Sequence, residues 1–187
     1  MKPKPVPYVL KHIQTDKPLR PADGDPEQVH IFSFFAESSK YNCVFKYIVR
    51  AEKFKDCYGI KYYCTRNKHS EHKYSRVLNF FSGTEVKRIM EVAASVIPKI
   101  LAIDAYASFA FNGSRTYDHA DYIEGPRRTQ RFRIYMEIVR RLFGEKVFYI
   151  TYFDDSSSCI FVNRRANPDI YAAKIRIYSM FAELFEI

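Results

Sequence analysis

The sequence predicts an α+β protein with a mixed, mostly antiparallel sheet of about seven strands, three helices and one parallel strand–helix–strand unit. Aromatic and β-branched runs separated by turn residues fill the first half of the chain and predict strands there. Three later stretches place apolar residues at helical spacing. A further strand lies between the first two helices, and a crossover in one sheet makes it parallel to the strand before the first helix. A chain of 187 residues can bury a core without disulfides or metals.

The first 27 residues differ from the rest because they hold most of the prolines. Alternating Lys and Pro at residues 2–5 favour an extended, polyproline-like chain. We therefore predict a Pro-rich basic N-terminal arm at residues 1–27 and a single α+β domain at residues 28–187. No stretch reaches the ~18 apolar residues of a membrane-spanning helix, and the N-terminus has no apolar signal-peptide core. We expect a cytoplasmic protein with no membrane partner.

Aromatic-rich segments open the domain. The four predicted strands are Val29–Ala36, Cys43–Arg50, Cys57–Thr65 and Ser75–Phe81. The second and third flank a charged turn at Lys53–Asp56, which is typical of neighbours in an antiparallel meander. The four cysteines of the chain lie in apolar or alternating runs and form no C-x-x-C pair, so we expect reduced, structural thiols.

The first helix is predicted from a capping box at Ser82–Glu85, where a hydroxyl precedes a carboxylate by three residues. Apolar residues recur at helical spacing over residues 86–101, and Pro98 predicts a kink or an end nearby. Ala105–Phe111 follows as a buried strand. We expect it to run parallel to Ser75–Phe81.

The remaining elements alternate between helix and strand. They are a loop at Asn112–Gly125, an arginine-rich helix at Thr129–Phe143, a hairpin of Lys146–Phe153 and Ser158–Asn163, and a final helix capped by Asn167. Gly144 is expected to end the arginine-rich helix, and Pro168 fits the first position of the final helix.

The candidate site is an arginine cluster near the predicted parallel strands. Ligands of such sheets favour the crevice beyond the carboxyl ends of the strands, where two loops should meet beside the start of the arginine-rich helix. Arginines at a helix N-terminus oppose the helix dipole, which indicates an anion held among guanidinium and backbone N–H groups. The predicted ligand-binding residues are Ser82, Gly83, Thr84, Asn112, Ser114, Arg115, Arg127, Arg128 and Arg131.

The alternative is that Asp118, Asp121 and Glu124 neutralise the arginines without any ligand, as surface ion pairs do. Tyr135 lies on the apolar face of the same helix, which is typical of a core aromatic. The sequence holds no complete catalytic or metal-binding signature, and we expect neither a metal nor a cofactor.

The element order from about Ser75 to Asn163 resembles the GNAT acyltransferase superfamily, with Ile134-Tyr135-Met136-Glu137 similar to its leucine–tyrosine–glutamate motif. It also resembles small uncharacterised bacterial and phage domains that pair a strand with a helix containing Arg and Tyr. The GNAT resemblance implies that the first helix N-terminus holds the pyrophosphate of acyl-CoA. It also implies that Tyr135 is the general acid, with acetyl-CoA as cofactor.

A net charge of +9 and a pI of about 9.3 favour nucleic acid, nucleotides or acidic partners, general solubility being the alternative. Three functional hypotheses remain open. The first is a non-enzymatic module that binds nucleic acid or a phosphate-bearing ligand through its arginines. The second is a divergent acyltransferase with Tyr135 as acid. The third is a protein-interaction or assembly domain, in which the aromatic strands or the last helix could form a homodimer.

Overall fold

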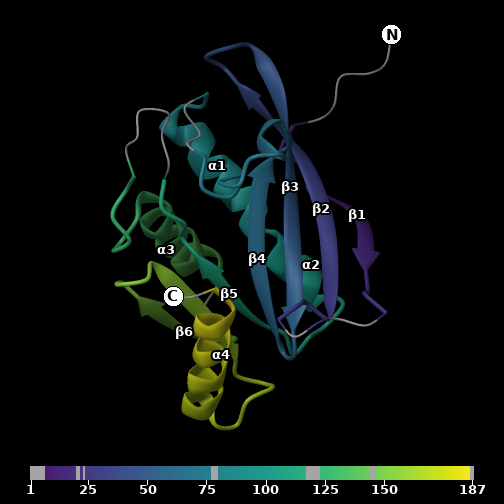
Figure 1. The fold of residues 1–187 in the computed structure, drawn as a ribbon, viewed down its shortest axis with the longest axis vertical. Helices are drawn as coiled ribbons and strands as arrows, with labels where there is room; N and C mark the ends of the chain where they lie inside the picture. The colour runs from purple at the N-terminus through teal and green to yellow at the C-terminus, as the bar shows by residue number, and fades with distance from the viewer. Residues whose placement is uncertain are drawn as a thin grey trace.

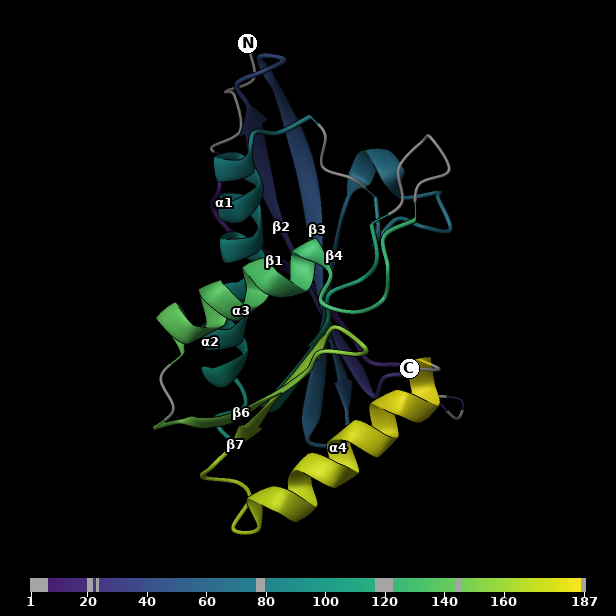
Figure 2. The ribbon, with the colours of Figure 1, turned by 90° about the vertical axis from the view of Figure 1, so that its left-hand side faces the viewer.

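The computed structural model describes residues 7–19, 22, 24–76, 80–116, 123–143 and 146–185. They form one seven-stranded mixed sheet with helices on both faces (Figures 1 and 2), so the predicted α+β class is confirmed. The strands are β1 Lys11–Asp16, β2 Gln28–Ser38, β3 Cys43–Phe54, β4 Cys57–Cys64, β5 Ser108–Asn112, β6 Phe148–Phe153 and β7 Ser158–Asn163. The helices are α1 Gly83–Ala94, α2 Val96–Leu101, α3 Gln130–Leu142 and α4 Ile170–Phe185, with a 3₁₀ turn at Thr65–Asn67.

The sheet has the order β1-β2-β3-β4-β5-β7-β6, and only β4 and β5 run parallel. Helices α1, α2 and α3 cover one face and α4 covers the other (Figure 2). Alternation along the strands supplies both cores. In β5, for example, Phe109 and Phe111 enter the larger core under α1–α3, whereas Ala110 enters the smaller core under α4.

The parallel partner of β5 differs from the one predicted. Cys57–Gly59 of β4 pairs with β5, and the described part of Ser75–Phe81 contains no strand; residues 77–79 lie outside the described residues. The apolar residues at the end of Ser75–Phe81 pack against the core and do not form a strand. Phe81 is buried and its ring lies 5.3 Å from that of Phe45, which fixes the chain where α1 begins.

Strand β1 lies within the predicted N-terminal arm, where the sequence indicated no strand. It pairs antiparallel with β2, with a register shift between His12 and Gln14. All six of its residues are exposed, so it has no alternation of apolar and polar residues from which a strand could be predicted. The backbone ladder makes Lys11–Asp16 a strand, with the Thr15 hydroxyl on His30 and the His12 ring on Phe32 as added contacts to β2. Residues 1–6 of the arm lie outside the described residues.

The predicted first helix is divided in two at Ser95. Pro98 is the third residue of α2, within the first turn, where the missing N–H of proline breaks no helical hydrogen bond. The capping box is confirmed: the Ser82 hydroxyl accepts from the Glu85 N–H, and the Glu85 carboxylate accepts from the Ser82 N–H at 2.7 Å. The break between α1 and α2 falls at Ser95, and Pro98 lies just beyond it in the first turn of α2.

The last helix begins later than predicted. Asp169 caps it, because its carboxylate accepts from the Ala172 N–H at 2.9 Å. Asn167 instead donates from its side chain to the carbonyl of Asn163. Gly144, expected to end the arginine-rich helix, lies outside the described residues.

The four cysteines are free thiols, and Cys57, Cys64 and Cys159 are buried. Burial raises the pKa of all three thiols, so they remain protonated and unreactive at neutral pH. Among the described residues, no helix is both long and apolar enough to cross a membrane.

A histidine pair joins β1 to β2. His30 is 2% exposed, and its Nδ1 lies 3.0 Å from the Thr15 hydroxyl, which also contacts Nε2 of His12 at 3.1 Å. The His30 Nε2 is buried and has no hydrogen-bond partner among the described residues. Burial first, and then the neighbouring His12, Lys17 and Lys53, lower the pKa of His30. The folded protein therefore holds this imidazole neutral.

This pairing predicts acid-sensitive stability. Because the folded-state pKa of His30 lies below its unfolded value of about 6.5, the unfolded chain binds more protons and stability falls as pH drops below that value. The free energy of unfolding, measured in urea, should decline from pH 7.5 to pH 5.5 in the wild type and decline less in His30→Gln. The exposed His69→Gln variant is the control and should keep the wild-type slope. Equal slopes in His30→Gln and the wild type would contradict this account.

Candidate functional site

The sheet opens between its two parallel strands. β4 and β5 pair only from Cys57–Gly59 to Ser108–Ala110. Beyond these pairs β4 stays paired with β3 as far as Cys64, and β5 stays paired with β7 as far as Asn112. The strands diverge toward their carboxyl ends, where ligands of such sheets commonly bind.

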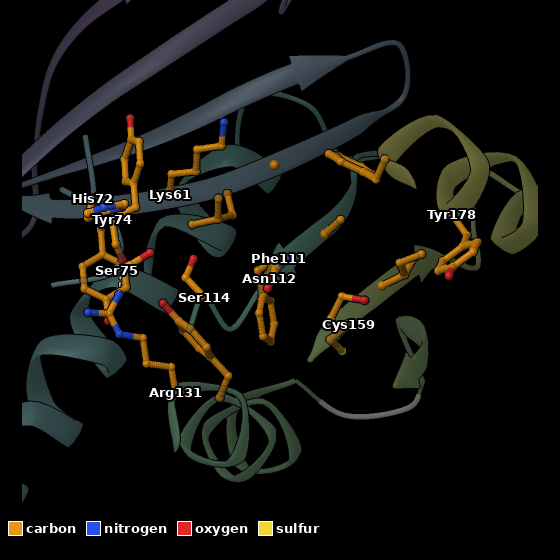
Figure 3. A pocket seen from close by; sticks show the side chains of 18 of the residues that line it. Lys61, His72, Tyr74, Ser75, Phe111, Asn112, Ser114, Arg131, Cys159 and Tyr178 are labelled. Carbon is orange, nitrogen blue, oxygen red and sulfur yellow. Dashed lines mark hydrogen bonds between the residues drawn. The ribbon is translucent and has the colours of Figure 1, made fainter. Parts of the chain in front are cut away.

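A pocket of about 340 Å³ lies in this opening (Figure 3). Its walls come from β4, the loop after the 3₁₀ turn, β5, α3, β7 and α4. The lining residues are Gly59, Ile60, Lys61, Tyr62, Glu71, His72, Tyr74, Ser75, Ala110, Phe111, Asn112, Ser114, Arg131, Tyr135, Ser158, Cys159, Ile160, Tyr178 and Phe181. Its size is at the lower end of the range for small-molecule sites.

Gly113 holds the end of β5 away from β4. Its N–H donates to the Ser157 carbonyl at 2.7 Å, and its carbonyl accepts from the Thr129 hydroxyl. A Cβ at this position would lie 2.6 Å from the backbone nitrogen of Phe132, closer than real side chains approach. Only glycine therefore lets the chain pass this close to the first turn of α3.

Arg131 on α3 supplies a cation to the pocket. Its terminal nitrogens donate to the backbone carbonyls of Tyr74 and Arg76, which joins the helix to the loop. Its guanidinium lies 6.0 Å from the ring centre of Tyr62. Among the residues that the structure describes, no carboxylate forms an ion pair with Arg131. Its charge is balanced there by carbonyl dipoles and by the face of the Tyr62 ring.

Two tyrosines face each other across the opening. Tyr62 of β4 and Tyr135 of α3 have ring centres 6.4 Å apart in a T-shaped arrangement, and Tyr135 also packs on Phe111 at 4.4 Å. Burial, and after it the phenol of Tyr62, raises the pKa of Tyr135 well above its ordinary value, so this hydroxyl stays protonated. The Tyr62 hydroxyl is buried, and within the described ranges it makes no hydrogen bond of acceptable geometry.

The other charged lining residues are more exposed or already paired. Lys61 lies 2.9 Å from the Glu52 carboxylate, which also accepts from Arg50 at 2.8 Å. Burial tends to raise the pKa of Glu52, but the two cations more than offset it and the pKa is lowered. Glu71 and His72 line the pocket from the loop, and both are exposed.

The structure divides the predicted site residues into two groups. Asn112, Ser114, Arg131 and Tyr135 line the pocket. Ser82, Gly83 and Thr84 do not line it; they start α1, whose N-terminus is occupied by the chain itself. The Glu85 carboxylate accepts from the N–H groups of Ser39 and Ser82, which lowers the pKa of Glu85 to about 2.

The predicted arginine cluster is likewise dispersed. Arg127 pairs with Asp155 at 3.2 Å and Arg128 with Asp154 at 3.7 Å, both on the β6–β7 turn. Arg115 donates to the backbone carbonyl of Glu124. Among the described residues, the carboxylates that pair with Arg127 and Arg128 are therefore those of the hairpin. Asp118 and Asp121, named as the alternative, lie outside the described residues.

Glu124 explains how arginines are tolerated at the start of α3. Its carboxylate accepts from the Gln130 N–H at 2.6 Å and from the Thr116 N–H at 3.1 Å, and the Thr129 hydroxyl accepts from the Phe132 N–H. The chain thus supplies its own negative charge and cap to this helix end.

Sequence reasoning missed Tyr62, Lys61, His72 and Tyr178 as site residues, although all of them line the same pocket as Arg131. A partial signal existed in β4. The alternation in Cys57–Cys64 places Tyr62 on the face that packs under α3, but nothing local shows that the strand beside it departs.

Comparison with known proteins identifies no relative. No protein-family model matches the chain, and no curated protein and no solved structure matches it significantly.

Proposed function

We propose that this protein binds a small phosphate-bearing ligand in the pocket between β4 and β5, with Arg131 as the anion-binding group. The observation that carries the proposal is a half-buried guanidinium that lines a pocket and has no acidic partner among the described residues. A charge in such a place is stabilised by an anion, and guanidinium groups form strong, charge-assisted hydrogen bonds with phosphate.

Neutral donors beside Arg131 support a phosphate. The Tyr62 hydroxyl has an unused hydrogen-bonding capacity, and the protonated phenol of Tyr135 lies beside it. Asn112 and Ser114 add amide and hydroxyl groups to the same wall. Donors from β4, α3 and the end of β5 can therefore converge on the oxygens of one anion.

The proposal narrows the sequence hypothesis from nucleic acid to a small ligand. Proteins that bind single-stranded nucleic acid use a groove lined by available cations and by aromatic rings that stack on the bases. In this protein Arg127 and Arg128 are paired with carboxylates of the β6–β7 hairpin. The net charge of +9 then contributes by attracting an anionic ligand from a distance.

Phenyl phosphate is a suitable first probe. At a concentration one hundred times its dissociation constant it should stabilise the protein by ~2.7 kcal/mol. Arg131→Gln should weaken binding by roughly 10- to 100-fold, as expected for one charge-assisted hydrogen-bonding group. The measurement is calorimetric titration with matched thermal melts.

Arg133→Gln is the matched control, since Arg133 is exposed on the same helix and does not line the pocket. The double variant Arg127→Glu/Arg128→Glu should also bind normally. Arg131→Lys keeps the positive charge but lacks the paired N–H donors of the planar guanidinium, so it should bind with intermediate affinity. Wild-type affinity in Arg131→Gln, or no binding by the wild type at millimolar concentration, would refute the proposal.

Acyl transfer is a second candidate, favoured by the position of Tyr135. This tyrosine lines the pocket from the helix after β5, and its hydroxyl is protonated, as a general acid requires. The element order β4–α1–α2–β5–α3–β6–β7 is compatible with the GNAT-like order noted in the sequence. Glu85 at the N-terminus of α1 opposes a pyrophosphate there.

Acetyl-CoA tests this candidate directly. If it is a substrate, it should raise the melting temperature, and Glu85→Gln should increase that shift because a repelling charge is removed. Tyr135→Phe should preserve binding but slow transfer of the acetyl group to amine acceptors, measured as the appearance of free CoA, by roughly 100-fold or more. No thermal shift with millimolar acetyl-CoA in either the wild type or Glu85→Gln would eliminate acyl transfer from CoA.

A further inference from the structure

Building on the proposed function, we infer that the ligand is a single-chain amphiphile whose anionic head meets Arg131. Its apolar tail passes between β4 and β5 toward α4. The pocket itself indicates this class of molecule, because its chemistry changes from one end to the other.

Polar groups gather at one end of the pocket (Figure 3). His72, Tyr74, Ser75 and Arg131 lie together there, and Ser114 points toward the same region. The half-buried guanidinium makes this the end where a charged group would be held. The exposed carboxylate of Glu71 also lines the pocket and would repel an anion bound at Arg131. Because Glu71 lies in solvent, this repulsion is screened.

The opposite end is apolar and lies under α4. Tyr178 marks it in Figure 3, and Ile160 and Phe181 line it as well. Ser158, which lies on the same strand as Ile160, also lines the pocket, whereas Cys159 belongs to the larger core on the other face. Ile160 and Phe181 belong to the smaller core, where they are 3% and 6% exposed. Ile160 and Phe181 offer no hydrogen-bond partner, so a sugar at this end would lose most of its hydration and could gain in return only the hydroxyls of Tyr178 and Ser158 among the lining residues.

The two ends meet where the strands separate. Gly59 and Ala110 form the last pair of the parallel ladder, and both line the pocket. They contribute no side chain and one methyl group, so the passage is bounded by the smallest residues. A Cβ on Gly59 would lie 3.3 Å from the Phe181 ring, which places α4 directly over this point. A tail that passes between the strands here must lie beside the Phe181 ring, which already occupies the space over Gly59.

Tyr62 provides an independent reason to place the head group at the mouth. Its hydroxyl is buried beside the Tyr135 phenol and makes no hydrogen bond of acceptable geometry in the described structure, and its ring lies beside the Arg131 guanidinium. An anionic oxygen at Arg131 would give this hydroxyl an acceptor. Head and tail are thus assigned by separate features, the unsatisfied phenol at one end and the apolar core at the other.

A series of n-alkyl phosphates from butyl to decyl, each kept below its micelle-forming concentration, tests the inference by calorimetry. Each added methylene should tighten binding by roughly four-fold until the apolar end is filled, after which affinity should level off. Inorganic phosphate should bind most weakly. Octanol should bind more weakly than octyl phosphate, and that difference should shrink in Arg131→Gln but not in Arg133→Gln.

Ala110→Leu should obstruct the passage, so affinity should level off at a shorter chain while butyl phosphate binds as in the wild type. If that variant does not fold, the chain-length series on the wild type decides alone. Octanoate tests which anionic head group the site prefers. If octanoate binds more tightly than octyl phosphate, the amphiphile is retained and phosphate is overturned as its head group.

The outcomes separate this inference from the proposed function. Arg131-dependent binding that is independent of chain length would overturn the amphiphile and leave the phosphate site intact. Binding that rises with chain length but ignores Arg131→Gln would overturn the role of Arg131 as head-group receptor. If neither inorganic phosphate nor any alkyl phosphate binds, both the function and the inference are wrong.

Discussion

The anchoring of β5 at Gly113 is the constraint on which the pocket depends. Gly113 donates to the β6–β7 turn and accepts from Thr129, so the chain after β5 is drawn toward β7 and the start of α3. The absence of a side chain permits the contact with Phe132 that this path requires. β4 meanwhile continues along β3. Two neighbouring strands are thus committed to opposite sides, and the sheet must open between them.

The same anchor positions the chemistry of the opening. Thr129 caps α3 while it donates to Gly113, so the helix that carries Arg131 and Tyr135 begins at a fixed distance from the end of β5. Arg131 then holds the loop after the 3₁₀ turn through two backbone carbonyls. A pocket with a cation at one end and core side chains at the other follows from how these elements meet.

Patterned segments were predictable from the sequence and unpatterned ones were not. Strands β2 to β4 alternate between two faces, and the capping box at Ser82 announces α1, because each signal is local. β1 is held by its backbone ladder and by contacts of His12 and Thr15 with β2, and its exposed side chains show no apolar alternation that would indicate a strand. The apolar residues of Ser75–Phe81 suggested a strand, yet Phe81 is an anchor for the chain before α1.

The candidate site was predictable only in part for the same reason. Asn112, Ser114, Arg131 and Tyr135 follow from the rule that ligands bind beyond parallel strands. The described partners of Arg127 and Arg128 depend on how the β6–β7 turn packs, which the sequence around these arginines does not show. Tyr62 is far from Arg131 in the chain, so only the fold brings the buried hydroxyl and the guanidinium together.

A crystal structure of the protein grown with octyl phosphate tests the central claim most directly. The account predicts phosphate oxygens within hydrogen-bonding distance of Arg131 and Tyr62, and an alkyl chain that passes Gly59 and Ala110 toward α4. Phosphate bound at Arg127 and Arg128, or strands β4 and β5 paired beyond Gly59 and Ala110 with no pocket between them, would contradict it.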